Sequence, residues 1–403
     1  MESKKYKHLL AFVLLSLSIL LVYDLFFQSE MRQEVTSDRN FPRIYRSILL
    51  LIYSFYLVVL KTGVKIKFNG LFKAIYCLII FNIILGGDLS ISVLISLSKV
   101  LFFFFTYLFF YRVFSIMPCT SKKYVKKFVL FSIISLSSYI VISRIGNTSG
   151  LTKIYGDNNA YILLSFMPFI YLLNFKRKNI LLLILTIAIF LSLKRGAIFA
   201  LIIAIIPLFF HKNRAKKHTI PRLVKNLVFI ILSFFIISYL LDNFQGIILE
   251  RTADLSFENQ EELGSGRGMM YLYMYDDFLN SSNFFTLLFG FGYESVQELL
   301  KKKLGSGLMA HSDILNFMHS YGLLGLSLLS WFILHQRKIV SRLFKAKSQY
   351  FIPYYMIFII FSFKAVYSGN FEQQNFSYLL ICYAFLNVLV IKHNKLEFKF
   401  NER

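Results

Sequence analysis

The stretch "NILLLILTIAIFLSLKRGAIFALIIAIIPLFF", residues 179–210, decides the fold class. It consists of two apolar runs, and its only charged residues are Lys194 and Arg195 between them. Similar runs recur along the whole chain of 403 residues, which is 57% hydrophobic and 18% aromatic, and charged residues are confined to short clusters between the runs. A soluble core needs polar residues spread through the sequence, so this pattern predicts an all-α, polytopic integral membrane protein.

The apolar runs predict about twelve transmembrane helices. Several are nearer 15 than the roughly 20 residues that a bilayer core usually requires, so short, tilted or re-entrant segments are expected among them. The predicted spans are residues 9–27, 44–60, 71–87, 89–111, 128–143, 160–175, 180–193, 196–210, 223–243, 314–334, 350–368 and 376–391. We therefore expect nine helices within 1–243, one large external loop at 244–313, and three helices and a cytoplasmic tail within 314–403.

The net charge of +24 is unevenly distributed over the connections between these spans. The two tails and the connections on their side hold 28 Lys and Arg against 3 acids, whereas the opposite connections hold 13 basic residues against 16 acids. The positive-inside rule then places both termini in the cytoplasm. It also explains the basic charge without a nucleic-acid partner.

The three cysteines do not form an external framework. Cys77 and Cys382 fall in predicted spans and Cys119 falls in a predicted cytoplasmic connection. Neither a disulfide framework nor a zinc-thiolate site is expected.

The external loop at residues 244–313 carries 10 of the 21 acidic residues. Long loops are usually functional or disordered. Met270, Met274 and Phe278 recur with helical spacing, which predicts short helices that lie on the membrane surface or pack on the bundle. The structural alternative is a surface lid without chemistry.

Two basic segments could bind an anion on the external side. Lys194 and Arg195 interrupt an apolar block, where a tight turn with both side chains reaching lipid headgroups is the structural alternative. Because positive-inside bias disfavours a basic outer turn, an external anion is the other interpretation. Arg267 lies among glycines in "LGSGRGMMY", residues 263–271, where backbone N–H groups and a forked guanidinium can approach phosphate oxygens. A flexible hinge with a solvated arginine is the alternative there.

The segment "MAHSDILNFMHSYGLLGL", residues 309–326, places His311 and Asp313 at the mouth of a span and His319 eight residues later. A neutral imidazole can accept a proton from a hydroxyl, and a carboxylate can orient it. For Asp313 and His319 we expect structural roles, as a helix cap and as a satisfied interhelical side chain; Ser312 is the other candidate cap. Eight residues is poor helical spacing for a metal site, so no metal is expected.

Four segments together, "LSLKRGA", "GSGR", "LLFGFGYES" and "AHSDILNFMHSYGLLGL", resemble the O-antigen ligase and Wzy-type polysaccharide polymerase family in their order and placement. The resemblance covers residues 190–330. Two positions depart from the family pattern, because Lys194 stands where serine is usual and Ser312 stands where asparagine is usual. The resemblance implies a GT-C-like membrane fold.

The resemblance also implies a function. It is glycosyl transfer with inversion on the outer face of the bacterial inner (plasma) membrane, without a metal or other cofactor, from a glycan on undecaprenyl pyrophosphate; a chain-length regulator is a further expected partner. Arg195 and Arg267 correspond to the arginines that hold the pyrophosphate, and His311 to the histidine that meets the acceptor hydroxyl. Arg251 is a third candidate for the pyrophosphate, and Lys194 and Asp313 are supporting residues.

Three functions remain open. A polymerase extends the glycan by a repeat unit, and a ligase moves it to a terminal acceptor such as lipid A core. The departures at Lys194 and Ser312 favour the polymerase, since polymerases are the more divergent group. A flippase or transporter for lipid-linked oligosaccharide is the third candidate, because Lys99 and Lys364 fall within predicted spans.

Overall fold

The computed structural model describes residues 2–30, 40–59, 70–85, 91–116, 118–146, 159–173, 175–192, 194–211, 267–281, 283–305, 311–371 and 376–401. Over these ranges the chain forms helices and no strands, so the predicted all-α class is confirmed for the described part. The helices are α1 (Glu2–Glu30), α2 (Asn40–Val59), α3 (Gly70–Leu85), α4 (Ile91–Ile116), α5 (Pro118–Gly146), α6 (Asn159–Leu172), α7 (Lys178–Leu191), α8 (Arg195–His211), α10 (Arg267–Leu279), α11 (Phe284–Phe289), α12 (Ser295–Leu304), α13 (Asp313–Lys345), α14 (Phe351–Tyr367) and α15 (Phe376–Asn401).

Eleven of the twelve predicted spans coincide with a helix, namely α1 to α8 and α13 to α15. Four of these are long and apolar enough to cross a membrane, and the other seven are shorter apolar helices. The predicted span at residues 223–243 lies outside the described residues. The count of twelve crossings therefore stays a prediction, whereas the membrane class is supported.

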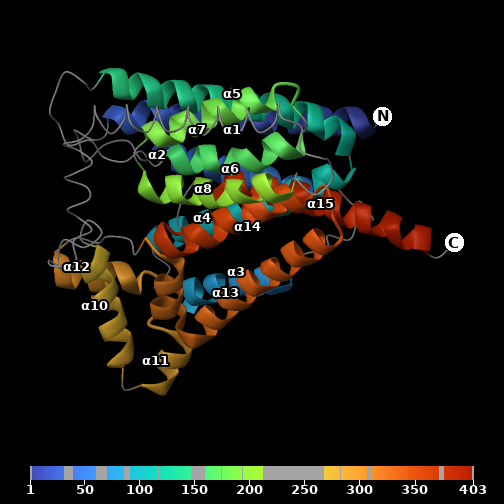
Figure 1. The fold of residues 1–403 in the computed structure, drawn as a ribbon. Helices are drawn as coiled ribbons and strands as arrows, with labels where there is room; N and C mark the ends of the chain where they lie inside the picture. Colours follow the sequence, from blue (N-terminus) through green and yellow to red (C-terminus); the bar gives the residue numbers. More distant parts are fainter. Residues whose placement is uncertain are drawn as a thin grey trace.

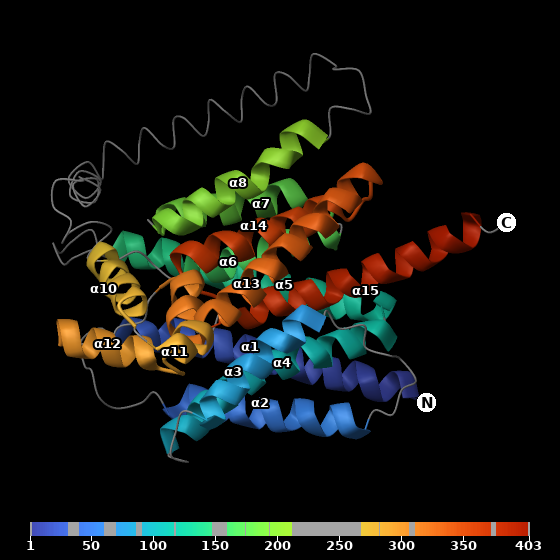
Figure 2. The same cartoon turned by 90° about the horizontal axis from the view of Figure 1, so that it is seen from below.

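The long helices pack side by side as one bundle (Figure 1). The beginning of α1 and the end of α15 lie at one end of this bundle, and α10, α11 and α12 lie at the opposite end, as both views show (Figures 1 and 2). Both described ends of the chain are therefore on the same side, which is the arrangement that the charge distribution predicts.

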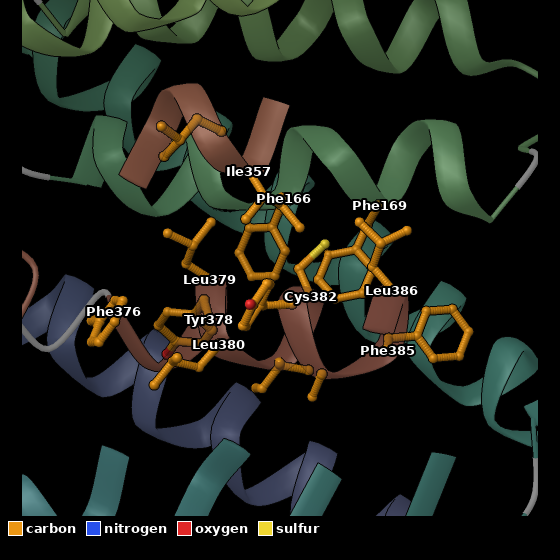
Figure 3. Close-up of a cluster of buried hydrophobic side chains, with 14 of the residues drawn as sticks. Phe166, Phe169, Ile357, Phe376, Tyr378, Leu379, Leu380, Cys382, Phe385 and Leu386 are labelled. Atoms are coloured by element: carbon orange, nitrogen blue, oxygen red, sulfur yellow. The ribbon is translucent and has the colours of Figure 1, made fainter. Parts of the chain in front are cut away.

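Aromatic and aliphatic side chains fill the space between the helices. Phe166 and Phe169 of α6 face α15, where Cys382 and Leu386 are among the buried side chains (Figure 3). Large apolar side chains such as Leu51 are exposed on the outer surface of the bundle. An apolar exterior around a packed apolar interior is what a bilayer solvent permits, because the hydrophobic effect does not act between helices in lipid and close packing must hold them.

Helix α13 is broken at Gly322, which has φ +66° and an extended ψ. The predicted span 314–334 lies within α13, a candidate membrane span, but the chain changes direction within it (Figure 1) and the second part continues to Lys345. A break leaves carbonyl oxygens without their intrahelical donors. Here the N–H groups of Phe291 and Gly292 donate to the carbonyls of His319 (2.9 Å) and Ser320 (3.0 Å).

The close contact at this break requires glycine on both sides. A Cβ at Gly290 would overlap the backbone at Ser320, and a Cβ at Gly322 would meet the backbone at Leu288. Both glycines also have positive φ, a conformation that L side chains rarely adopt. The glycines of "LLFGFGYES" and "HSYGLLGL" thus meet in space and fix α11 to α13.

The described part of the segment that is predicted to be an external loop contains short helices, α10 to α12. Met270, Met274 and Phe278 are buried on one face of α10, which contacts α12 and α13. Of the two predicted placements, packing on the bundle is therefore confirmed for this face.

Candidate active site

Three helices, α6, α8 and α10, begin around Tyr161, which is buried in the first turn of α6. At the start of α8, a Cβ on Gly196 would overlap the Tyr161 hydroxyl, so glycine permits this approach. The hydroxyl also interacts with the Ser368 side chain and with the charge of Arg267 at the start of α10. The N-terminus of a helix carries a partial positive charge, so their convergence favours an anion at this place.

Arg267 is held against the end of α14. Its guanidinium donates to the carbonyl of Tyr367 at 3.0 Å, across 100 residues of sequence. The contact fixes one edge of a group that has five N–H donors. Burial raises the pKa of the neighbouring Tyr271 hydroxyl, and the charge of Arg267 opposes that rise. Arg267 is thus an ordered cation at the edge of the bundle, which disfavours the hinge interpretation.

Lys194 and Arg195 lie at the break between α7 and α8. The backbone N–H of Lys194 donates to the hydroxyl of buried Ser192 at 3.2 Å, and that hydroxyl donates to the carbonyl of Ile189. The carbonyl of Lys194 then accepts from the next turn, so α8 starts at once. The predicted tight turn between two short helices is confirmed, and both basic side chains are half-buried.

His311 directly precedes the cap of α13 and has φ +52°. A left-handed conformation at a residue with a Cβ costs roughly 1–2 kcal/mol, so the surrounding structure must impose it. Burial, followed by the charges of Arg267 and Lys194, lowers the pKa of the imidazole to about 4. His311 is therefore neutral at pH 7, and cations from two distant segments act on one imidazole.

Ser312 and Asp313 have structural contacts. The hydroxyl of Ser312 accepts from the N–H of Leu315, which makes Ser312 the helix cap. Asp313 is 1% exposed, and its carboxylate accepts from the backbone N–H of Asn370 at 2.7 Å, from the Asn370 side chain at 2.9 Å and from the N–H of Phe371. Asp313 thus holds the turn that follows α14 instead of capping its own helix.

Lys364 of α14 is fully buried and lies next to Tyr161 and Asp313. Its ammonium group is 5.6 Å from the ring centroid of Tyr161, and Asp313 is its acidic neighbour. The sequence showed the charge in a span but not its partners. Sequence reasoning did not select Tyr161 and Asn370, and it named Lys364 only as a charge that favours the transporter.

His319 lies apart from the cationic cluster. Its Nε2 atom is 3.0 Å from an Asp277 carboxylate oxygen and its Nδ1 atom is 3.0 Å from the Ser295 hydroxyl. Its ring stacks on Phe291. The expected interhelical role of His319 is confirmed, since it joins α10, α12 and α13. Within the described ranges, no group of three His, Cys, Asp or Glu residues could hold a metal ion.

The structure therefore brings His311, Arg267 and Lys194 together and places Arg195 at the same helix start. Arg251, the third arginine named from the sequence, lies outside the described residues. No curated protein matches the chain. Residues 180–330 match the family model described as O-Antigen ligase. This range includes Lys194, Arg195, Arg267 and His311, and the match confirms that the chain resembles the O-antigen ligase and Wzy-type polymerase family.

Proposed function

We propose that the protein is a polysaccharide polymerase that transfers a growing glycan from undecaprenyl pyrophosphate to the next lipid-linked repeat unit. The family match supports membrane glycan processing by a glycosyl-transferring enzyme. The observation that carries the proposal is the convergence of three separate segments, since the charges of Arg267 and Lys194 act on the imidazole of His311.

The cations fit the departing pyrophosphate. Breaking the bond between the sugar and the pyrophosphate leaves negative charge on the diphosphate, and fixed cations stabilise it most as that charge develops. Arg267 and Arg195 are the proposed binding residues, with Lys194 in support. The helix starts at Arg195 and Arg267 add partial positive charge in the same place. Arg251 remains a third candidate.

His311 is the proposed general base. The acceptor hydroxyl attacks the anomeric carbon, the bond from that carbon to the pyrophosphate oxygen breaks on the opposite face, and the hydroxyl proton passes to the imidazole. The product has inverted configuration. Without donor, burial and two cations hold the pKa of His311 low. An anionic pyrophosphate beside Arg267 and Lys194 would offset their charge and raise this pKa, so the base strengthens when donor is present.

The position of the cluster suits a lipid-linked donor. A polyprenyl chain confines its pyrophosphate to the membrane surface, and the cluster lies at the bundle end that carries α10 to α12 (Figure 1). By the positive-inside rule this is the outer face of the bacterial inner membrane. The proposed partners are the lipid-linked oligosaccharide and a chain-length regulator.

Two other functions compete with the polymerase. A ligase would use the same cluster with a terminal acceptor, and only the departures at Lys194 and Ser312 favour the polymerase. A transporter is disfavoured by the position of Lys364, which lies three residues before the end of α14 and next to Tyr161 instead of near the middle of a span.

A gene deletion in the host distinguishes these functions. The deletion strain is complemented with the wild-type gene or with Arg267→Ala, and extracted glycans are run on a gel that resolves chain length. We expect the deletion and the variant to leave single repeat units on lipid. Long chains accumulating on the polyprenyl carrier would support the ligase instead, and an unchanged ladder in the deletion strain would contradict both enzymes.

A further inference from the structure

The short helix α11 has no buried side chain. Its phenylalanines project outward, with Phe284 69% and Phe285 68% exposed. Phe289 and Phe291 are also exposed, and residues 280–293 contain no charged residue. These four phenylalanines form what we call the aromatic tip. An exposed apolar patch of this kind on a folded protein marks a surface that contacts another protein or a membrane.

The aromatic tip is rigidly attached to α13. Asn283 caps α11 by accepting from the N–H of Phe285 at 2.9 Å. At the other end of α11, Gly290 packs on the backbone of Ser320, and Phe291 donates to the carbonyl of His319 while stacking on its ring. The exposure of the phenylalanines is therefore a property of a fixed helix.

The aromatic tip continues the lipid-facing surface of α13. The contact with α11 lies directly before Leu323, which is exposed, and farther along α13 Trp331 and Leu334 are exposed as well. Helix α13 is a candidate membrane span. Figure 1 shows α11 at the margin of the molecule, beside the break in α13. An apolar surface that adjoins the exposed side of a span faces the same solvent, which is lipid.

We propose that the aromatic tip inserts among the acyl chains of the leaflet at this end of the bundle, just below the phospholipid headgroups. Aromatic side chains are enriched at this depth. The neighbouring helix α12 has the complementary composition, since Glu298 and the lysines Lys301 to Lys303 are exposed on it. Charged α12 lies at the headgroups and uncharged α11 lies in the acyl region. The inference depends on the membrane class of the protein and not on the proposed glycosyl transfer.

Insertion of the aromatic tip has a consequence for the site. His319 joins α13 to Asp277 of α10, and Arg267 begins that same helix. A tip fixed in lipid therefore holds α10 at a constant depth, which places the guanidinium of Arg267 at the membrane surface.

The test uses the full-length protein in phosphatidylcholine vesicles whose acyl chains carry bromine atoms, which quench nearby tryptophan fluorescence. Trp331 is the only tryptophan of the chain and is exposed on α13, so the wild-type protein is the positive control. In a Trp331→Phe background, Phe285→Trp and Phe284→Trp report on the aromatic tip, and Lys302→Trp on α12 is the matched control.

We expect both tip reporters to be quenched about as strongly as Trp331, and most strongly by bromines near the headgroup end of the acyl chain. Lys302→Trp should be quenched weakly. Quenching of both tip reporters no greater than that of Lys302→Trp contradicts the proposal. Efficient cross-linking of Phe285→Cys to a second copy of the chain in the membrane also contradicts the proposal, because the aromatic tip is then covered by protein and not by lipid.

Discussion

His311 and His319 lie eight residues apart on one segment of the chain but in opposite electrostatic environments. His311 lies among the cations Arg267 and Lys194 in a left-handed conformation. His319 is 1% exposed, and Asp277 and Ser295 occupy its two ring nitrogens. An imidazole whose nitrogens are both engaged by protein groups is suited to hold helices together, whereas one beside a pair of cations is suited to chemistry on an anionic substrate. Residue type alone therefore does not distinguish a histidine that acts as a base from one that holds helices together.

Replacing His311 is expected to have the largest effect on activity. His311→Ala removes the proposed base but keeps a Cβ in the same left-handed conformation, so polymer should be lost while the protein still folds and inserts. The measurements are the amount of polymer in the complemented deletion strain and the amount of folded protein in the membrane. Normal polymer length and amount from this variant would refute the role.

Replacing Arg267 should have the next largest effect. Arg267→Ala removes a cation that stabilises the departing pyrophosphate, and the rate should fall roughly 10- to 1000-fold, by analogy with other groups that stabilise developing charge. Arg267→Lys keeps the charge but loses the forked geometry and the full set of donors, so it should restore only part of the activity. Initial rates of the purified protein check both variants; equal rates for all three proteins would remove Arg267 from the site.

Replacing His319 should act mainly on stability. His319→Ala leaves the Ser295 hydroxyl without its imidazole partner and unlinks α10 from α13, which should destabilise helices α10 to α12 by about 1–3 kcal/mol. We expect faster proteolysis within α10 to α12 and a smaller loss of activity than in His311→Ala. His319→Gln, which keeps a donor and an acceptor, is the control that should recover part of the stability. If His319→Ala is as stable as the wild type and lacks activity, the comparison between the two histidines fails.

The pH dependence should show the smallest effect. Burial, Arg267 and Lys194 lower the pKa of His311 to about 4, so the active neutral form persists in the free enzyme until the pH falls towards that value. The acid limb of kcat/KM reports the free enzyme and should lie well below the ordinary histidine value of about 6.5. Lys194→Met removes one of the two cations and should move the limb to higher pH. A limb that stays in place would show that another group titrates there.

Much of the fold followed from the sequence because apolar runs are local signals. The break in α13 did not, since Gly322 adopts its conformation against Leu288 of α11 and Gly290, which caps the end of α11. A lone glycine in an apolar span does not identify such a partner.

The candidate site was predicted in part for the same reason. Arginines and a histidine in apolar or glycine-rich surroundings are visible as exceptions in the sequence. The contact of Asp313 with Asn370 spans 57 residues and the contact of His319 with Asp277 spans 42, and neither separation follows a helical or strand period. Tyr161 could not be distinguished from other tyrosines of the spans until Gly196 and Arg267 were seen beside it.

The most direct test of the central claim is polymerisation by the purified protein in vesicles without an ion gradient. The substrate is one repeat unit on polyprenyl pyrophosphate, and wild type, His311→Ala and His319→Gln are compared at equal amounts of folded protein. We predict a ladder of elongated glycan from wild type and His319→Gln and single units alone from His311→Ala. An unchanged ladder from His311→Ala, or no ladder from the wild type, would contradict a glycosyl-transfer site built on His311.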